Sequence, residues 1–138
     1  VLPNPPGILS LLDRHGIRIL EDDLLNCSRR LRYAPAQSAD PFEALTEQYF
    51  NLPPCSTRNS SIQDRLTELW AKIDHTGARG VIFYVVKFCE PELFDIPLLT
   101  TALKKRGVKT LVIDVELGRH LSGQLETRLE AFIEMLTD

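Results

Sequence analysis

The fold is decided by residues 81–91, which read Val81-Ile82-Phe83-Tyr84-Val85-Val86-Lys87-Phe88-Cys89-Glu90-Pro91. The first six form an unbroken apolar run of β-branched and aromatic side chains, which is typical of a strand buried on both faces of a parallel sheet. A second β-branched run, Val108 to Val115, follows the segment Leu93–Arg106, whose apolar residues have helical spacing and which Gly107 ends. The order strand, helix, strand predicts a parallel pair.

Further elements are predicted on both sides of this unit. They are a helix containing Ile8 to Leu12 and ended by Gly16, a strand over Ile17–Leu20, a helix that begins at Asp40-Pro41, a helix from Ser60-Ser61 to Gly77 that buries Ile62, Leu66, Leu69, Trp70 and Ile73, and a last helix with Leu125, Leu129, Phe132, Ile133 and Leu136 inward. Strands that alternate with helices predict an α/β fold. We expect a small three-layer domain in which helices flank a parallel sheet of three or four strands, flavodoxin-like or Rossmann-like.

The size of the chain predicts one domain, residues 1–138. A chain of this length buries enough surface for a core of its own. It begins with Val1 rather than Met, and Val1 to Gly7 resembles a connection between domains. We therefore expect a piece of a longer protein.

Composition excludes several classes of protein. The chain has 16 Lys and Arg against 19 Asp and Glu, a net charge of −3, so nucleic acid is not the expected partner. The longest apolar run, Val81–Val86, is too short to cross a bilayer, and no signal peptide is recognisable. Three widely spaced cysteines are typical of reduced thiols. These observations predict a cytoplasmic location and no membrane partner.

The cysteines are the candidate site residues. Cys27 follows the first predicted strand, Cys55 precedes a helix, and Cys89 follows the strand of residues 81–86. Ligands of open parallel sheets bind beyond the carboxyl ends of the strands, so the topology predicts all three at one edge. Thiolates suit zinc or iron–sulfur clusters. No C-x-x-C is present, however, and a free cysteine is more often a small buried apolar residue, so this alternative stays open.

Other polar groups give weaker signals. Arg29, Arg30 and Arg32 could pair with phosphates, although a solvated loop that balances the acidic residues 21–23 is slightly favoured. His120 is expected in an edge loop as a solvated residue rather than a base. Neither G-x-G-x-x-G nor G-x-x-x-x-G-K-[ST] occurs, so the sequence lacks both nucleotide-binding fingerprints.

Several segments carry a resemblance to a known family. They are Gly80-Val81-Ile82, Lys87-Phe88-Cys89-Glu90-Pro91, Pro97-Leu98-Leu99, Val112-Ile113-Asp114-Val115-Glu116, and, most specifically, Gly123 to Glu134. Upstream, Glu21-Asp22-Asp23-Leu24, Arg32-Tyr33, Asp40-Pro41 and Pro54-Cys55 follow the same family order. Nearly the whole chain thus resembles the C-terminal domain of the 2-hydroxyacyl-CoA dehydratase and benzoyl-CoA reductase subunit family.

The resemblance implies a function and a set of partners. Subunits of this family pair as heterodimers and typically hold a [4Fe-4S] cluster between domains, and an ATP-dependent activator protein supplies an electron. The substrate is an acyl-CoA thioester, from which water is eliminated or whose aromatic ring is reduced. The cysteine that matches the family's ligand is Cys89. Cys55 matches a recurrent Pro-Cys position without an assigned role, and Cys27 is placed less clearly. No catalytic residue is assigned, and the remaining domains of the subunit are implied partners.

Two other functions stay open at this point. The chain could be a non-catalytic module that binds CoA thioesters or assembles subunits, or a three-cysteine metal or redox-sensing domain. Loss of bound metal on Cys89→Ser would favour a role for this thiol as a metal ligand.

Overall fold

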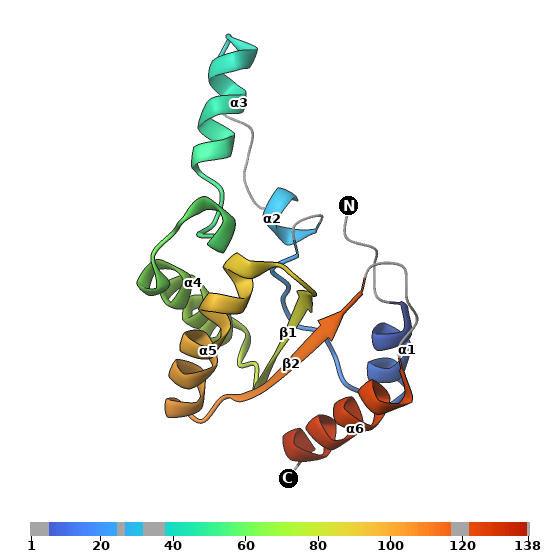
Figure 1. Ribbon diagram of the computed structural model, residues 1–138. Helices are drawn as coiled ribbons and strands as arrows, with labels where there is room; N and C mark the ends of the chain where they lie inside the picture. Colours follow the sequence, from blue (N-terminus) through green and yellow to red (C-terminus); the bar gives the residue numbers. More distant parts are fainter. Residues whose placement is uncertain (1–5, 25–26, 32–37, 117–121, 138) are drawn as a thin grey trace.

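A computed structural model describes residues 6–24, 27–31, 38–116 and 122–137. The elements in chain order are α1 (Pro6–Arg14), α2 (Ser28–Leu31), α3 (Pro41–Phe50), the 3₁₀ turn η1 (Ser56–Arg58), α4 (Ile62–Thr76), β1 (Gly80–Val86), α5 (Glu90–Lys105), β2 (Lys109–Val115) and α6 (Gly123–Thr137). Figure 1 shows the two strands between a pair of helices on either side. No helix in these residues is long and apolar enough to cross a membrane.

The predicted strand–helix–strand unit is confirmed. β1 and β2 pair in parallel, with Gly80 opposite Lys109 and Val86 opposite Val115. The helix between them, α5, begins at Glu90, three residues earlier than the apolar spacing predicts, because Glu90-Pro91 supplies its first turn. Pro97 therefore lies inside the helix rather than in its first turn.

The prediction of three or four strands is wrong for the described residues, where the sheet has two strands. Residues 17–24 form an irregular segment instead of the predicted strand at Ile17–Leu20. In a strand packed on the core, neighbouring side chains would alternate between buried and exposed. Here the adjacent residues Ile19 and Leu20 are both exposed. A cavity of about 490 Å³ is lined by this segment, α4 and β1. A flavodoxin-like or Rossmann-like arrangement is not confirmed.

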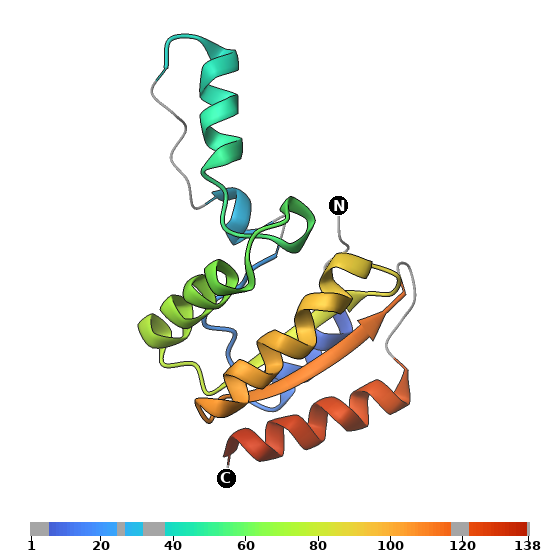
Figure 2. The same ribbon diagram turned by 60° about the vertical axis from the view of Figure 1, so that its left-hand side comes forward.

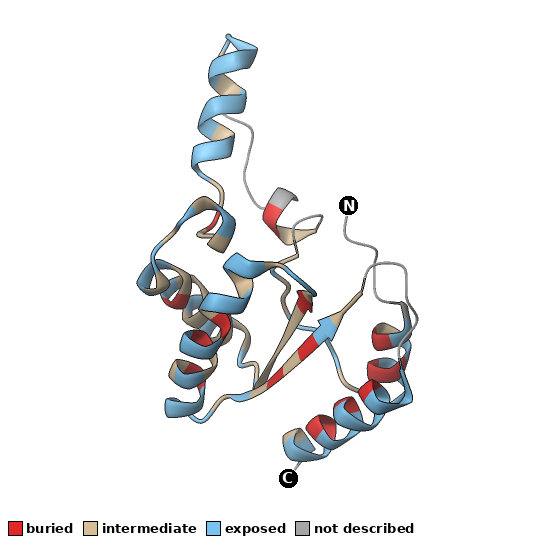
Figure 3. Ribbon diagram, in the orientation of Figure 1, coloured by how far each residue is buried: buried red, intermediate tan, exposed pale blue. Residues whose placement is uncertain are grey.

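The core lies mainly on one face of the sheet. It joins α1, β2 and α6 through Ile8, Leu11, Leu12, Leu111, Ile113, Leu125, Leu129, Phe132 and Ile133. The opposite face is covered by α5, which buries Ile96, Leu99 and Leu103, and α4 packs beside α5 (Figure 2). Figure 3 shows the buried positions concentrated on the inward sides of these helices and in the strands. The predicted three layers are therefore present, with a narrower sheet.

Gly80, at the start of β1, is a position where an added side chain would force its neighbours in the core to shift. A Cβ there would lie 2.7 Å from Leu136 Cδ2 and 2.8 Å from Phe132 Cζ. We expect Gly80→Ala to lower the free energy of unfolding by about 1–3 kcal/mol in urea titrations, because overpacking forces the core to shift. The control is Gly123→Ala, since a Cβ at Gly123 meets nothing within 4 Å. Equal stabilities for the two variants would contradict this packing.

One helix stands apart from the core. α3 projects away from the rest of the described chain, as Figures 1 and 2 both show. None of its residues is buried. The sequence predicts this helix and its Asp40 cap. Its large apolar side chains, Phe42, Leu45, Tyr49 and Phe50, are exposed.

Candidate functional site

The first candidate residue, Cys89, lies at the carboxyl end of β1. After Val86 the chain makes one more ladder bond, from the N–H of Lys87 to the carbonyl of Val115 at 2.9 Å, and then turns. Phe88 has a φ of +68°, a region that non-glycine residues rarely adopt, and its side chain is exposed. Cys89 is the N-cap residue of α5, and its N–H donates to the carbonyl of Val86 at 3.1 Å. A rigid strand end and a helix start thus fix the half-buried Cys89.

Cys55 begins the short turn η1. Its N–H donates to Ser60 Oγ at 3.0 Å, and its Sγ forms a hydrogen bond of 3.1 Å with Thr57 Oγ1. Burial acts to raise the pKa of the Cys55 thiol, but the hydrogen bonds from Thr57 and the charge of Arg29 outweigh it. The pKa therefore lies below its usual value, although the charge of Glu92 opposes the change. The hydrogen bonds from Thr57 and the charge of Arg29 thus stabilise the thiolate of Cys55 relative to that of a free cysteine.

A hydrogen bond joins the segments of Cys55 and Cys89. Ser56, the residue after Cys55, donates through Oγ to Glu92 Oε1 at 2.6 Å. Glu92 lies in the first turn of α5, three residues after Cys89. Arg65 of α4 donates to the same carboxylate at 3.1 Å and pairs with Asp95 one turn further along. The starts of η1 and α5 are therefore fastened to each other and to α4.

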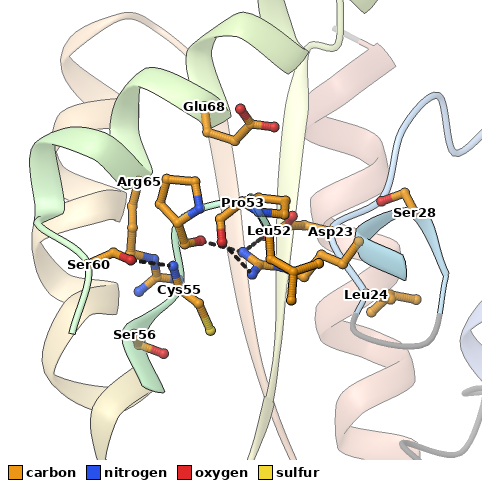
Figure 4. A network of polar contacts seen from close by, with 12 residues as sticks. Asp23, Leu24, Ser28, Leu52, Pro53, Cys55, Ser56, Ser60, Arg65 and Glu68 are labelled. Carbon is orange, nitrogen blue, oxygen red and sulfur yellow. Dashed lines mark hydrogen bonds and ion pairs between the residues drawn. The ribbon is translucent and has the colours of Figure 1, made fainter. Parts of the chain in front are cut away.

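Arg29 joins the segment of Cys27 to that of Cys55. Its guanidinium is buried and donates to the carbonyls of Pro53 at 3.3 Å and Pro54 at 2.6 Å, and it pairs with Asp23 at 2.9 Å. Figure 4 shows this network between the loop at Pro53 and Cys55 and the segment of Asp23, Leu24 and Ser28. Cys27 lies two residues before Arg29, is half-buried and, like Cys55 and Cys89, forms no disulfide. These hydrogen bonds and ion pairs join neighbouring segments that contain the cysteines. That the three thiols meet at one edge of the sheet stays a prediction.

Proximity of the segments does not amount to a complete metal site. In the part of the chain that the structure describes, no group of three or more His, Cys, Asp and Glu side chains could hold a metal ion. Any cluster bound at this edge needs ligands from elsewhere.

The arginine predictions have a mixed outcome. Arg29 does pair with the acidic segment, but it is buried, so the expectation of a solvated loop is wrong for this residue. Two backbone carbonyls and a carboxylate contact the Arg29 guanidinium and replace the water that burial removes. The side chain of Arg30, and Arg32 and His120 altogether, lie outside the described residues.

Two cations of α4, the buried Lys72 and the half-buried Arg65, were not among the predicted site residues. Lys72 is buried and its Nζ donates to Asp23 Oδ1 at 2.8 Å and to the carbonyl of Asp22 at 3.0 Å. Arg65, seven residues earlier, makes the ion pairs with α5. Positions seven apart share a helix face, and both residues lie beside the apolar positions Leu66, Leu69 and Ile73. This spacing could have indicated that the two cations lie on the inward side of α4. Of the apolar residues predicted to be buried on this helix, only Leu66 is fully buried.

Asp22 makes the stability of this network depend on pH. Burial acts to raise the pKa of Asp22, but N–H groups of Leu24 and Ser28, the Ser28 side chain and the charge of Lys72 bring it below its usual value. A carboxyl with a lowered folded-state pKa stabilises the fold above its unfolded pKa of about 3.9, and this contribution is lost as the pH falls through the folded pKa. We expect urea unfolding to show a steeper loss of stability below about pH 4 in the wild type than in Asp22→Asn. Parallel pH profiles would contradict this.

The fold defines a class: an α/β domain with a parallel strand pair between helices, in which Cys55 and Cys89 precede the starts of η1 and α5. The comparisons with known proteins are more specific. The family described as 2-hydroxyglutaryl-CoA dehydratase, D-component, matches residues 1–136. The chain belongs to this family, as the resemblance in the sequence indicates.

The relatives are subunits of enzymes. The chain is 30% identical over 137 residues to lactoyl-CoA dehydratase subunit beta of Anaerotignum propionicum, covering 99% of this chain and 37% of the relative. It is 27% identical to the (R)-phenyllactyl-CoA dehydratase beta subunit of Clostridium sporogenes, and the match covers 99% of this chain and 36% of that subunit. A match to a benzoyl-CoA reductase subunit of Thauera aromatica has 25% identity and covers 75% of this chain and 28% of that protein. The chain thus spans little more than a third of the length of the curated dehydratase subunits that it matches.

Proposed function

We propose that this chain is the cysteine-bearing C-terminal domain of an iron–sulfur subunit in a 2-hydroxyacyl-CoA dehydratase or benzoyl-CoA reductase, and that Cys89 supplies one thiolate to a [4Fe-4S] cluster. The observation that carries the proposal is the position of Cys89. It is held by the end of β1 and the start of α5, in a family whose relatives are dehydratase and reductase subunits. A cluster ligand needs a scaffold that moves little, and a strand end provides one.

The residues present fit such a group in part. Thiolates are the usual ligands of iron–sulfur clusters. Hydrogen bonds join the segment of Cys55 to that of Arg29 and to the first turn of α5, which supports a role for Cys55 beside Cys89. The described residues do not form a complete ligand set. We therefore propose Cys89 as a ligand and Cys55 as a second candidate, with Cys27 as the weakest of the three, and assign the other ligands to chain outside these residues.

The chain's own side chains have two roles in this proposal. The ion pairs of Arg65 and the hydrogen bonds of Arg29 hold the cysteine segments in place before any cluster binds. Phe88, next to Cys89, and Phe94 and Leu98 of α5 have exposed apolar side chains, which would exclude water once a neighbouring domain covers them. When bound, the cluster supplies one-electron chemistry, and its potential depends on solvent exposure and hydrogen bonding.

The names of the relatives suggest the rest of the assembly. They act on lactoyl-CoA, (R)-phenyllactyl-CoA and benzoyl-CoA, and three are called beta subunits. We propose an acyl-CoA thioester as substrate, a homologous second subunit as partner, and an ATP-dependent activator protein as electron donor. The alternative is a module that binds CoA thioesters or assembles subunits without redox chemistry.

Iron analysis tests this proposal. The protein, at the length its gene encodes, is purified without oxygen in complex with its companion subunit, and iron and acid-labile sulfide are measured per subunit. We expect about four of each in this subunit and their loss in Cys89→Ser. Asp114→Ser, an exposed change on β2, is the control and should retain both.

Two outcomes would contradict the redox assignment. Full iron content in Cys89→Ser would exclude this thiol as an essential ligand. A wild-type complex without iron in this subunit, even after reconstitution with iron and sulfide, would favour the assembly module. Circular dichroism of each variant checks that it folds.

A further inference from the structure

We propose that α3 is a docking arm whose apolar face packs into a groove on the companion subunit, a groove with an apolar floor and a rim of Lys and Arg. The inference rests on the proposed function, because it takes the companion subunit of that assembly as the occupant. It assigns the contact to a helix that lies away from the cysteines.

The exposed face of α3 is unusually apolar for a free surface. Phe42 is 79% exposed, Leu45 62%, Tyr49 55% and Phe50 70%. Their spacing of three, four and one residues places them on one side of the helix. No residue of α3 is buried, so within the described chain the helix has no core contact that would explain these side chains.

The helix is nevertheless fixed at both ends. Asp40 caps its start by accepting from the N–H of Phe42 at 2.8 Å, and Pro41 occupies the first position. At its end, Arg58 donates to the carbonyls of Phe50 at 3.3 Å and Leu52 at 2.9 Å, and its guanidinium lies 5.1 Å from the centroid of the Tyr49 ring. Ten residues form only a marginal helix in water without such support. These contacts hold the arm in place although none of its residues is buried within the described part of the chain.

Arg58 also connects the arm to the cysteine edge. It lies in η1, three residues after Cys55, and η1 packs against α5. A partner seated on α3 would thus contact an element that is continuous with the candidate site. This makes the arm a suitable contact for a companion subunit of the same enzyme.

The apolar area that α3 exposes and the charges along the helix indicate which kind of partner surface fits it. The four exposed side chains offer roughly 500 Å², more than half of the about 800 Å² that each partner contributes to a standard interface. α3 contains Glu43 and Glu47 but no Lys or Arg, Asp40 precedes its start, and Arg58 at its end is the cation beside it, so acidic residues outnumber basic ones along this helix. Packing of two α3 helices from identical chains would bring acidic flanks together, which disfavours a second copy. A partner groove with a basic rim is complementary.

The test measures association of the gene-length subunit with its companion subunit, which mass spectrometry identifies as a second member of the same family. The double variant Phe42→Ser/Leu45→Ser removes half of the apolar face without touching a buried residue. The matched control is Ala44→Ser/Gln48→Ser, on the opposite side of the same helix. We expect the dissociation constant to rise roughly 30-fold or more in the first variant, with no comparable change in the control.

The thermal midpoint of the free subunit separates the remaining outcomes. An unchanged midpoint together with weakened association supports the docking arm. Unchanged association overturns it. A lowered midpoint of the free subunit also overturns it, because the face is then covered by another part of the same subunit. Since iron content is measured separately, failure here leaves the Cys89 assignment standing.

Discussion

Arg29→Met is expected to lower the free energy of unfolding by about 2–4 kcal/mol, because the carbonyl of Pro54 loses this donor and Asp23 loses one of its two cationic partners. The guanidinium satisfies the carbonyls of Pro53 and Pro54 and neutralises Asp23. Met fills a similar volume but donates nothing, so the loop that carries Cys55 loses its fastening to the segment that carries Cys27. Urea unfolding at neutral pH measures the loss.

Two further variants test the cause of this effect. Arg29→Lys keeps the charge but loses the planar fork, so we expect an intermediate loss. Arg18→Met removes an exposed arginine and should change stability by no more than about 0.5 kcal/mol. If Arg29→Met were as stable as Arg18→Met, the buried network would not hold these segments together.

Phe132→Ala is expected to cost about 3–5 kcal/mol, the largest effect of any single side chain in the core. Phe132 of α6 is 2% exposed and belongs to the cluster that joins this helix to α1 and β2. Truncation leaves a cavity that neighbouring leucines cannot fill without backbone movement. Thermal and urea unfolding should agree on the loss if the domain unfolds in one step.

Met135, three residues later, is the matched control on the same helix. It is 47% exposed, so Met135→Ala removes a long side chain without opening a cavity. We expect a change of no more than about 1 kcal/mol. Similar losses for the two variants would mean that α6 is not packed through the face that contains Phe132.

The parts of the fold that the sequence predicts well are those in which one local signal dominates. β1 and β2 are unbroken β-branched runs, and α4 and α6 carry helical spacing with a serine near each start, so their types follow from pattern alone. Ile17–Leu20 has strand composition but only four residues, and it does not pair with β1. Pairing depends on packing between distant segments, which a short run does not specify.

In the candidate site too, local features were predicted from the sequence, whereas contacts between distant segments were not. Topology places the cysteines at strand ends and helix starts, and the structure has Cys89 and Cys55 at such positions. The burial of Arg29 and Lys72 was not predictable from composition, because charged residues are buried only where specific partners converge. Those partners, such as the carbonyl of Pro54 and the carboxylate of Asp23, come from segments far away in the chain.

The central claim is that Cys89 ligates iron in the assembled subunit. The most direct measurement is a diffraction experiment at the iron absorption edge on crystals of the complete subunit, grown without oxygen. We expect an anomalous iron peak within bonding distance of Cys89 Sγ, at the carboxyl end of β1. Iron bound elsewhere in the subunit, with the Cys89 thiol away from it, would show that Cys89 is not a ligand.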